Sequence, residues 1–358
     1  MPILHIQNHD KFINPLNIFF TKYFNEVEHL FAISLRDKTT ILPHDFNHSL
    51  QIQGIKAYFD LIYHMYRSKK IILHSLFINP NILLILFLQP WLLKKCYWVV
   101  WGGDLYKYRE PKKTLRQKGF EYVRRKLIQN MHGICTLVNG DYELVKKWYN
   151  TKGKHYKVIV INEEKNEWVN TIAESDVHQK KDGDTITLLL GNSASKANNH
   201  IDSLKILSKF KNEKIKIICP LSYGDRKYAE EIIRYGKSIF GEKFIPLTNF
   251  MPIEEYIKFL NTIDIGIFNN NRQQGLGNIN SLLALGKKVY LRNDTTMYHE
   301  IKYQNNAVVF DVADIHKSIT TLDQLVMMDK KDIDKNKNIY RKIYSSSYAV
   351  KLWSEILN

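Results

Sequence analysis

The sequence predicts two α/β domains of the doubly wound type, each a parallel sheet covered by helices. Two observations support this fold class. The chain has 358 residues, which suits two domains of about 150 residues each. Short apolar runs also alternate with longer amphipathic segments along both halves, which is typical of parallel strands connected through helices.

The expected elements follow this alternation in chain order. In the first half they lie at 3–7, 17–24, 28–34, 52–66, 71–77, 81–88, 97–101, 113–129, 133–138 and 142–149. In the second half they lie at 185–190, 200–208, 215–219, 227–238, 244–246, 253–261, 263–268, 278–285, 288–291 and 308–310.

Residues 163–184 are polar, dense in charge and poor in periodicity, and this composition predicts a linker or surface hinge. We therefore divide the chain into a Rossmann-like domain at 1–165, a linker at 166–184, a second Rossmann-like domain at 185–330 and a helical tail at 331–358. The tail has the length to cross back onto the first domain.

The composition indicates a globular protein in a reducing compartment. The chain is 44% hydrophobic, and its three cysteines are far apart in apolar segments, so we expect buried thiols and no disulfide framework or zinc site. The N-terminus lacks the basic and apolar regions of a signal peptide. Residues 71–93 are uncharged, but polar and proline-containing turns divide them, which favours buried strand and helix over a membrane span.

The formal net charge of +16 predicts a surface that attracts polyanions: nucleic acid, anionic lipid or a nucleotide diphosphate. Much of this charge lies at 107–126, where apolar residues recur at roughly helical spacing. A basic amphipathic helix suits an anionic membrane surface, and the alternative is a solvated helix packed on its own domain. Aromatic residues do not interleave with this charge as a stacking platform requires, so no nucleic-acid partner is expected.

The most informative segment connects an apolar strand, 263–268, to a helix at 278–285. It contains Arg272, Gln273, Gln274, Gly275, Gly277 and Asn278. A helix that begins after glycines offers free N–H groups and its positive dipole end to a phosphate, and an arginine adds a bidentate cation. Such spacing is also found in simple tight connections.

Three further strand ends carry polar or aromatic loops, and in doubly wound folds ligands bind at these ends. The candidate binding residues there are Gly191, Asn192 and Ser193 after the first strand, Tyr223 after the second, and Phe250 and Met251 after the third. An ordinary capped turn is the alternative for Gly191 to Ser193, and simple packing is the alternative for Phe250. We predict that the four loops together bind a diphosphate and a nucleobase.

In the first half, an apolar strand ends in Trp101, Gly102, Gly103, Asp104 and Tyr106. Asp104 suits a general base or a group that accepts the hydrogen bond of a substrate hydroxyl, and a turn-capping role is the alternative. His74 ends another strand and is a second candidate for contact with the acceptor or the diphosphate, although a lone histidine there is often structural.

Motifs for metal-dependent or covalent chemistry are missing from the sequence. There is no Gly-x-x-x-x-Gly-Lys-Ser/Thr loop, no nucleophile elbow and no paired-histidine helix, and Asp-x-Asp occurs only at 182–184 and 332–334 in polar surroundings. We therefore expect no metal and no cofactor.

Three blocks resemble glycosyltransferase family 56. They are Trp101 to Tyr106, Gly191 to Ser193 followed by Asn199 to Ile201, and Arg272 to Gly277, and they occur in the family's order. The resemblance runs from about residue 74 to about residue 293. It implies a GT-B fold, in which two Rossmann-like domains face a cleft, with the nucleotide on the C-terminal domain and the acceptor on the other.

The resemblance further implies a metal-independent transfer of an acetamido-dideoxyhexose, such as 4-acetamido-4,6-dideoxygalactose, from a TDP-sugar to a polyprenyl-diphosphate-linked saccharide. Such a reaction belongs to bacterial surface polysaccharide synthesis, of the enterobacterial common antigen or O-antigen kind. The implied location is the cytoplasmic face of the inner membrane, with peripheral attachment to its anionic surface.

Under this interpretation Arg272 stabilises the leaving diphosphate, and Asp104, with His74 in reserve, activates or positions the acceptor hydroxyl. Trp101, Gly102, Gly103 and Tyr106 lie on the acceptor side. The helix after Gly277 lacks the two glutamates, spaced eight apart, of many retaining GT-B enzymes, so Asn278, Asn280 or Ser281 would substitute. A non-catalytic protein that binds nucleic acid or a membrane surface is the alternative function.

Overall fold

The computed structural model describes residues 1–9, 12–35, 49–112, 114–174 and 184–358. Their contacts divide the chain into two units. Unit 1 comprises Met1–Asn162 together with Ser345–Asn358, and unit 2 comprises Glu163–Tyr344.

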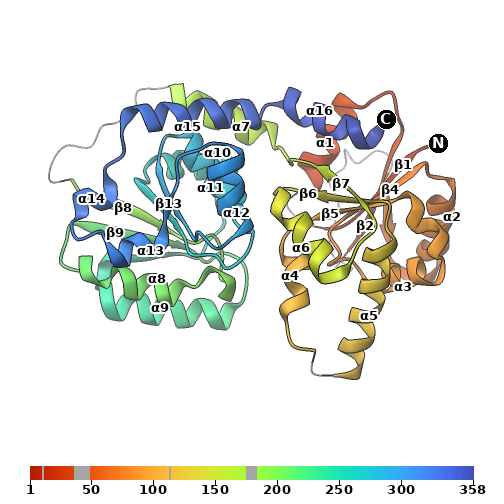
Figure 1. Cartoon of the computed structure of the whole chain (residues 1–358), viewed down its shortest axis with the longest axis horizontal. Helices are drawn as coiled ribbons and strands as arrows, with labels where there is room; N and C mark the ends of the chain where they lie inside the picture. The colour runs from red at the N-terminus through yellow and green to blue at the C-terminus, as the bar shows by residue number, and fades with distance from the viewer. Residues whose placement is uncertain (10–11, 36–48, 113, 175–183) are drawn as a thin grey trace. The chain divides into compact units, whose positions relative to one another are not determined.

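Unit 1 contains a seven-stranded parallel sheet with the strand order β3-β2-β1-β4-β5-β6-β7, and Figure 1 labels its strands β1, β2, β4, β5, β6 and β7. Its strands are β1 (Ile3–Asn8), β2 (His29–Ser34), β3 (Ser49–Ile52), β4 (Lys70–His74), β5 (Cys96–Val100), β6 (Gly133–Thr136) and β7 (Lys154–Lys157). Its helices are α1 (Ile13–Tyr23), α2 (Gly54–Arg67), α3 (Pro80–Leu88), α4 (Gly103–Tyr106), α5 (Leu115–Asn130), α6 (Asn139–Tyr149) and α16 (Ser346–Leu357). Because the order reverses beside β1, the topological switch point of this sheet lies between β1 and β4.

Unit 2 contains a six-stranded parallel sheet with the order β10-β9-β8-β11-β12-β13. Its strands are β8 (Ile186–Leu190), β9 (Ile215–Pro220), β10 (Phe244–Leu247), β11 (Ile265–Phe268), β12 (Lys288–Leu291) and β13 (Phe310–Asp311). Its helices are α7 (Glu163–Glu174), α8 (His200–Leu207), α9 (Arg226–Phe240), α10 (Ile253–Asn261), α11 (Leu276–Ala284), α12 (Thr296–His299), α13 (Val312–Lys317), α14 (Leu322–Val326) and α15 (Lys330–Ile343). This is the Rossmann strand order, with its switch point between β8 and β11.

Helices cover both faces of each sheet. In unit 1, side chains of α2, α3, α5 and α6 pack on one face, and α1 lies on the other, where Phe20 contacts His5 of β1 and Trp353 of α16. In unit 2, α8, α9, α13 and α14 cover one face, and α7, α10, α11, α12 and α15 cover the other. Strands buried on both faces explain the continuous apolar runs of the sequence.

The predicted basic helix is present as α5, but part of its apolar side packs against the core of its own unit. Thr114 and Gln117 form a capping box at its start, as expected for a Thr-x-x-Gln sequence. Val123, Leu127 and Ile128 are buried in the core of unit 1. The structure therefore favours the alternative that we weighed for this segment, a solvated helix packed on its own domain.

Part of the predicted linker is a helix. Residues Glu163–Glu174 form α7, where Val169 is buried in the core of unit 2 and Asn166 donates a hydrogen bond to the carbonyl of Tyr344 at 2.9 Å. The prediction was wrong here because α7 buries few apolar side chains and its sequence has little periodicity. Residues 175–183 of the predicted linker lie outside the described residues.

The C-terminal tail consists of two helices that belong to different units. α15 belongs to unit 2 and α16 belongs to unit 1. The break falls at Ser345, whose side chain caps α16 by accepting a hydrogen bond from the backbone N–H of Tyr348 at 3.2 Å. Trp353 of α16 is buried, and its Nε1 donates to the carbonyl of Ile159 at 3.0 Å.

No described helix has both the length and the apolar character needed to cross a bilayer. Residues 71–93, which raised the question in the sequence, form most of β4, the helix α3 and part of the 3-10 turn Pro90–Lys95.

We expect Trp353→Ala to lower the free energy of unfolding by about 3–5 kcal/mol, because it leaves a cavity between α1 and α16 and an unpaired carbonyl at Ile159. Urea denaturation followed by circular dichroism measures the change. Leu115→Ala is the matched control, since Leu115 is 86% exposed. A loss no larger than that of the control would contradict the role given to Trp353.

Candidate functional site

The polar loops of unit 2 meet at the switch point of its sheet. The segment after β8 begins with Gly191, and the segment after β11 begins with Asn269. Crevices at the carboxyl ends of strands that flank a switch point are the usual ligand site of doubly wound sheets.

Gly191 fixes the direction in which the chain leaves β8. Its φ is +70°, and its N–H donates to the carbonyl of Ile267 on β11 at 2.9 Å. A Cβ at this position would lie 2.6 Å from Nε2 of His200, closer than any side chain tolerates. Glycine is therefore required both by the left-handed backbone and by the packing of His200.

Side chains from three strand ends are joined by hydrogen bonds. Asn192 donates through Nδ2 to the hydroxyl of Tyr223 at 3.1 Å. Gln274 donates through Nε2 to Oγ of Ser193 at 3.0 Å. The structure thus brings together five of the predicted binding residues, since Gly275 also lies here: a Cβ on Gly275 would be 3.0 Å from Oδ1 of Asn192.

The helix α11 begins directly at this cluster. Its N-cap residue is Gly275, with a φ of +72° and no side chain to occupy the first N–H groups. The start of the helix, at Leu276 and Gly277, therefore offers backbone N–H groups and the positive end of the helix dipole, while the N–H of Asn278 already donates to the carbonyl of Gly275 at 2.9 Å. Arg272 lies in the preceding loop, partly buried, and its Nη1 donates to the carbonyl of Gln273 at 3.1 Å.

Several buried amide oxygens around this cluster accept no hydrogen bond from the residues that the structure describes. They are Oδ1 of Asn192, Asn270 and Asn280 and Oε1 of Gln273 and Gln274. An unmet acceptor costs about 1–3 kcal/mol when buried, so this concentration makes the cluster the candidate ligand site of unit 2. The amide nitrogens of Asn192, Asn270 and Gln274 donate within the cluster, which leaves their oxygens for the donors of a ligand.

Sequence reasoning missed Lys165 and Tyr256 in this region. Lys165 of α7 donates to the carbonyl of Gly277 at 2.6 Å, which places a cation at the first turn of α11. Asn278 makes a hydrogen bond with Tyr256 of α10, whose pKa is raised by burial. Lys165 lay at the end of the predicted first domain, 1–165, so nothing in the sequence connected it to this site.

Phe250 and Met251 follow β10, which does not neighbour β8 or β11 in the sheet. Phe250 is 81% exposed and Met251 is partly exposed, and β10 is the edge strand, separated from β8 by β9. Their proposed contact with a nucleobase stays a prediction.

In unit 1, Asp104 is completely buried and accepts four hydrogen bonds. Its Oδ2 accepts from the backbone N–H of Leu76 at 3.0 Å and from Nε1 of Trp98 at 2.8 Å. Its Oδ1 accepts from the backbone N–H groups of Trp101 and Leu105 at 3.0 and 3.1 Å. With 0% of its surface exposed, Asp104 holds the loops after β4 and β5 together, and this geometry favours the capping alternative over a general base.

The other residues of this motif are shaped around Asp104. Gly102 has a φ of +81° and begins α4. The Trp101 ring lies 4.5 Å from that of Phe12, and the Tyr106 ring contacts Trp148 edge-on at 5.2 Å. Gly103 is the first residue of α4. Trp101, Gly102, Gly103 and Tyr106 therefore frame the end of β5, and their predicted contact with an acceptor stays a prediction.

His74 ends a chain of three buried histidines that crosses β2, β1 and β4. Nε2 of His29 lies 3.2 Å from the carbonyl of Phe24, Nδ1 of His29 lies 2.9 Å from Nε2 of His5, and Nδ1 of His5 lies 3.0 Å from Nε2 of His74. Burial lowers the pKa of all three, that of His74 to about 3, so the rings are neutral near pH 7.

The carbonyl of Phe24 fixes the tautomer of the whole chain. Because a carbonyl only accepts, Nε2 of His29 carries its proton, and Nδ1 of His29 must accept from Nε2 of His5. His5 in turn accepts from Nε2 of His74, which leaves Nδ1 of His74 as a buried acceptor with no hydrogen-bond partner among the described residues. Such an atom suits a hydroxyl or N–H donor and repels a phosphate oxygen, so contact between His74 and a diphosphate is disfavoured.

The whole chain is similar to solved GT-B glycosyltransferases. An α,α-trehalose 6-phosphate synthase from Burkholderia multivorans gives a TM-score of 0.66 at 8% identity, covering 99% of this chain and 98% of that chain. Sucrose-phosphate synthase from Thermosynechococcus elongatus gives 0.64 at 10% identity, covering 99% and 96%. A trehalose-6-phosphate structure from E. coli, bound with UDP-2-fluoro glucose, gives 0.65 at 9% identity, covering 99% of both chains. At these identities the similarity shows the fold alone, which is GT-B.

The family assignment comes from the sequence. The model of the 4-alpha-L-fucosyltransferase family, glycosyl transferase group 56, matches residues 56–352. The chain therefore belongs to glycosyltransferase family 56, and it is a glycosyltransferase. A segment is also similar to ATP synthase subunit delta from Bacteroides fragilis, 24% identical over 139 residues, or 36% of this chain and 70% of that protein. This match is too distant and too short to assign a family.

Gly191→Ala should lower the free energy of unfolding by about 1–3 kcal/mol, because alanine is strained at a positive φ and its Cβ would collide with His200. Gly119→Ala is the control, since Gly119 lies in α5 with open space around it, and it should be stabilising by about 0.5–1 kcal/mol. Urea denaturation measures both. Equal stability of the two variants would refute the argument for Gly191.

Stability should fall in acid because the buried histidines bind protons only after unfolding. The pKa of His74 is about 3 in the folded chain against an ordinary 6.5, so its contribution is complete above pH 6.5 and is lost progressively as the pH falls toward 3. Between pH 7 and pH 5 this one residue should cost about 2 kcal/mol. Urea midpoints at the two pH values should differ less in His74→Gln than in the exposed control His132→Gln. Equal differences would contradict the assignment.

Proposed function

We propose that this glycosyltransferase moves an acetamido-dideoxyhexose, such as 4-acetamido-4,6-dideoxygalactose, from a TDP-sugar to a polyprenyl-diphosphate-linked saccharide. The observation that carries the donor site is the meeting of the loops after β8, β9 and β11 at the start of α11. The identity of the sugar and the acceptor rests on the resemblance of the three sequence blocks to family 56.

The diphosphate of the donor binds at the start of α11. The N–H groups of the first turn and the guanidinium of Arg272 supply hydrogen bonds and positive charge for the two phosphates. Arg272 is the residue that stabilises charge as the sugar–phosphate bond breaks. Lys165 adds a second cation at Gly277.

The sugar and ribose hydroxyls bind the buried amide oxygens of the cluster. Asn192, Gln274 and Asn280 present acceptors that lack partners, and sugar hydroxyls are the matching donors. Neutral amides of this kind take the place of the two glutamates that are absent from α11. Asn278, bonded to Tyr256, and Ser281, whose Oγ donates to the carbonyl of Gly277 at 2.9 Å, complete this side.

On unit 1, His74 is the better candidate for direct contact with the acceptor. Its bare Nδ1 accepts a hydrogen bond from a hydroxyl, whereas Asp104 has both oxygens occupied and acts as a positioning residue for the loop of Trp101 to Tyr106. The partners that we propose are the TDP-sugar, the lipid-linked saccharide and an anionic membrane surface at the cytoplasmic face of the inner membrane. We infer no cofactor, no metal and no nucleic-acid partner.

Arg272→Ala should weaken binding of TDP by about 10- to 100-fold, because it removes charge-assisted hydrogen bonds to phosphate. Isothermal titration calorimetry with TDP on the full chain measures this. Arg226→Ala is the matched control, since the side chain of Arg226 on α9 is 94% exposed and its loss should leave the affinity unchanged. Unchanged affinity in Arg272→Ala would remove Arg272 from the donor site, and stronger binding of UDP or GDP than of TDP would overturn the choice of nucleotide.

A further inference from the structure

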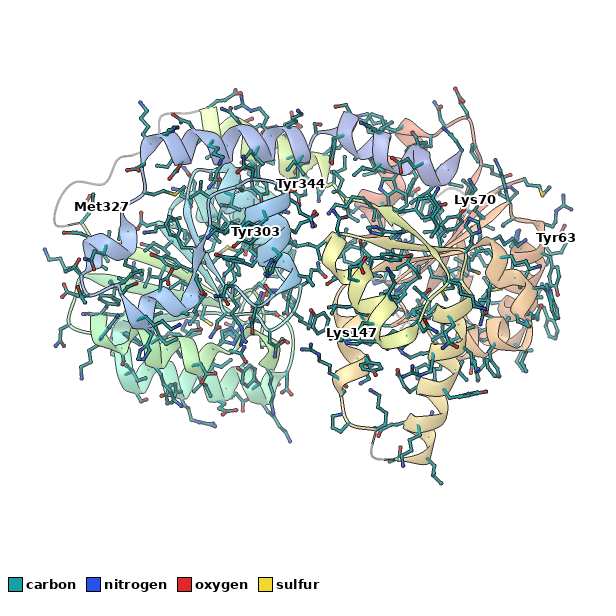
Figure 2. All side chains as sticks on the ribbon, in the orientation of Figure 1. Tyr63, Lys70, Lys147, Tyr303, Met327 and Tyr344 are labelled. Carbon is teal, nitrogen blue, oxygen red and sulfur yellow. The ribbon has the colours of Figure 1, made fainter. Side chains whose placement is uncertain are left out.

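The helix α2 has two apolar sides, and only one of them faces the protein. Ala57, Leu61 and Met65 recur every four residues and are buried against the sheet of unit 1. Ile55, Phe59, Tyr63 and Tyr66 form a second stripe, and all four are exposed, Ile55 by 78% and Phe59 by 68%. At 100° per residue the second stripe lies opposite the first. Figure 2 shows Tyr63 on the outer side of α2, directed away from the sheet.

The second stripe continues onto the neighbouring turn. Nε1 of Trp91 donates to the hydroxyl of Tyr66 at 3.0 Å, and Trp91 and the nearby Leu88 at the end of α3 are themselves exposed. We call the set Ile55, Phe59, Tyr63, Tyr66, Leu88 and Trp91 the α2 surface. Exposed apolar side chains gathered in one area of a protein surface mark a place of interaction.

The charges around the α2 surface are almost all positive. Lys56, Arg67, Lys69 and Lys94 are exposed at its border, and Asp60 is the acidic residue of α2. The guanidinium of Arg67 lies 5.6 Å from the ring centre of Tyr63 and donates to its hydroxyl at 2.9 Å. A second copy of the same surface would bring these cations together, so self-association is disfavoured. An anionic partner is favoured.

The side chains match a lipid surface in detail. Tyrosine and tryptophan, apolar at one end and polar at the other, are enriched where acyl chains meet water. Lysine and arginine beside them attract anionic head groups. A helix with aromatic and aliphatic residues on one face and cations at its borders lies in the plane of the interface.

We propose that the α2 surface docks unit 1 on an anionic lipid bilayer, with Phe59 and Ile55 inserted among the lipids and Lys56 and Arg67 at the head groups. This inference extends the proposed function, because a lipid-linked acceptor must be reached at a membrane. It also moves the membrane contact from the basic helix α5, where Val123, Leu127 and Ile128 are buried, to α2.

The test uses the full chain and vesicles made of phosphatidylglycerol and phosphatidylethanolamine, with phosphatidylcholine vesicles for comparison. In sedimentation assays the protein should bind the anionic vesicles and release from them as salt rises. Phe59→Ser combined with Tyr63→Ser should lower the partition coefficient at least about tenfold, or about 1.4 kcal/mol. Leu115→Ser combined with Tyr122→Ser on α5 is the matched control, because both residues are exposed, and it should bind like the unaltered chain.

Two outcomes would overturn the proposal. One is equal binding by the α2 variant and the unaltered chain, and the other is a dimer, seen by analytical ultracentrifugation without lipid, that the α2 variant makes monomeric. If the double variant does not fold, fluorescence still decides: anionic vesicles should shift the tryptophan emission to shorter wavelength, and Trp91→Phe should remove that shift. These vesicles contain no nucleotide and no acceptor, and TDP calorimetry contains no lipid, so the α2 surface and the donor site fail or succeed separately.

Discussion

The side chain of Asn198 holds the loops of the candidate site of unit 2 in place. Buried to 1% exposure, it accepts from the backbone N–H of Asn192 at 3.1 Å and donates to the carbonyls of Ser193 and Ser195 at 3.1 and 3.2 Å. It thereby acts as a local substitute for a strand partner where β8 has ended. Without Asn198, the hydrogen bond from Gly191 to Ile267 would be left to hold the left-handed turn. The position of Asn192 beside Tyr223 and Gly275 would then be less well fixed.

The proximity of these residues could be predicted because the ends of neighbouring parallel strands lie at one edge of the sheet. An apolar run followed by glycine and polar residues places those residues at the carboxyl edge of the sheet, so Asn192, Ser193, Tyr223 and Gln274 could be assigned to one site before their contacts were known. Asn198 and Lys165 were missed for different reasons. Asn198 lies in a polar loop, and the sequence pattern of such a loop does not show which of its polar side chains will hold the backbone. Lys165 contacts Gly277, which lies 112 positions away in the sequence.

Most helices and strands were predicted, and the exceptions are short or sparsely apolar. The edge strands β3 and β7 each have one buried residue among four, so no apolar run marks them in the sequence. The tail was predicted as one helix because nothing in its spacing separates α15 from α16. The break is revealed by the N-cap of α16, where the backbone N–H of Tyr348 donates to the side chain of Ser345. In the sequence, a serine at this position could equally lie inside a continuous helix.

Asp104 and His74 show what a strand-end pattern cannot decide. Both lie where a catalytic group is expected, and both are buried, but their surroundings give them opposite properties. Four N–H groups donate to the carboxylate of Asp104, so both of its oxygens are occupied and it holds the loops after β4 and β5 in place. In the histidine chain, each ring donates its proton toward the carbonyl of Phe24: His74 donates to His5, His5 to His29, and His29 to the carbonyl. Nδ1 of His74 is therefore left as an acceptor that no described residue uses. The orientation of three rings on three strands, which no pattern within one strand encodes, therefore determines which of the two residues retains the capacity to bind.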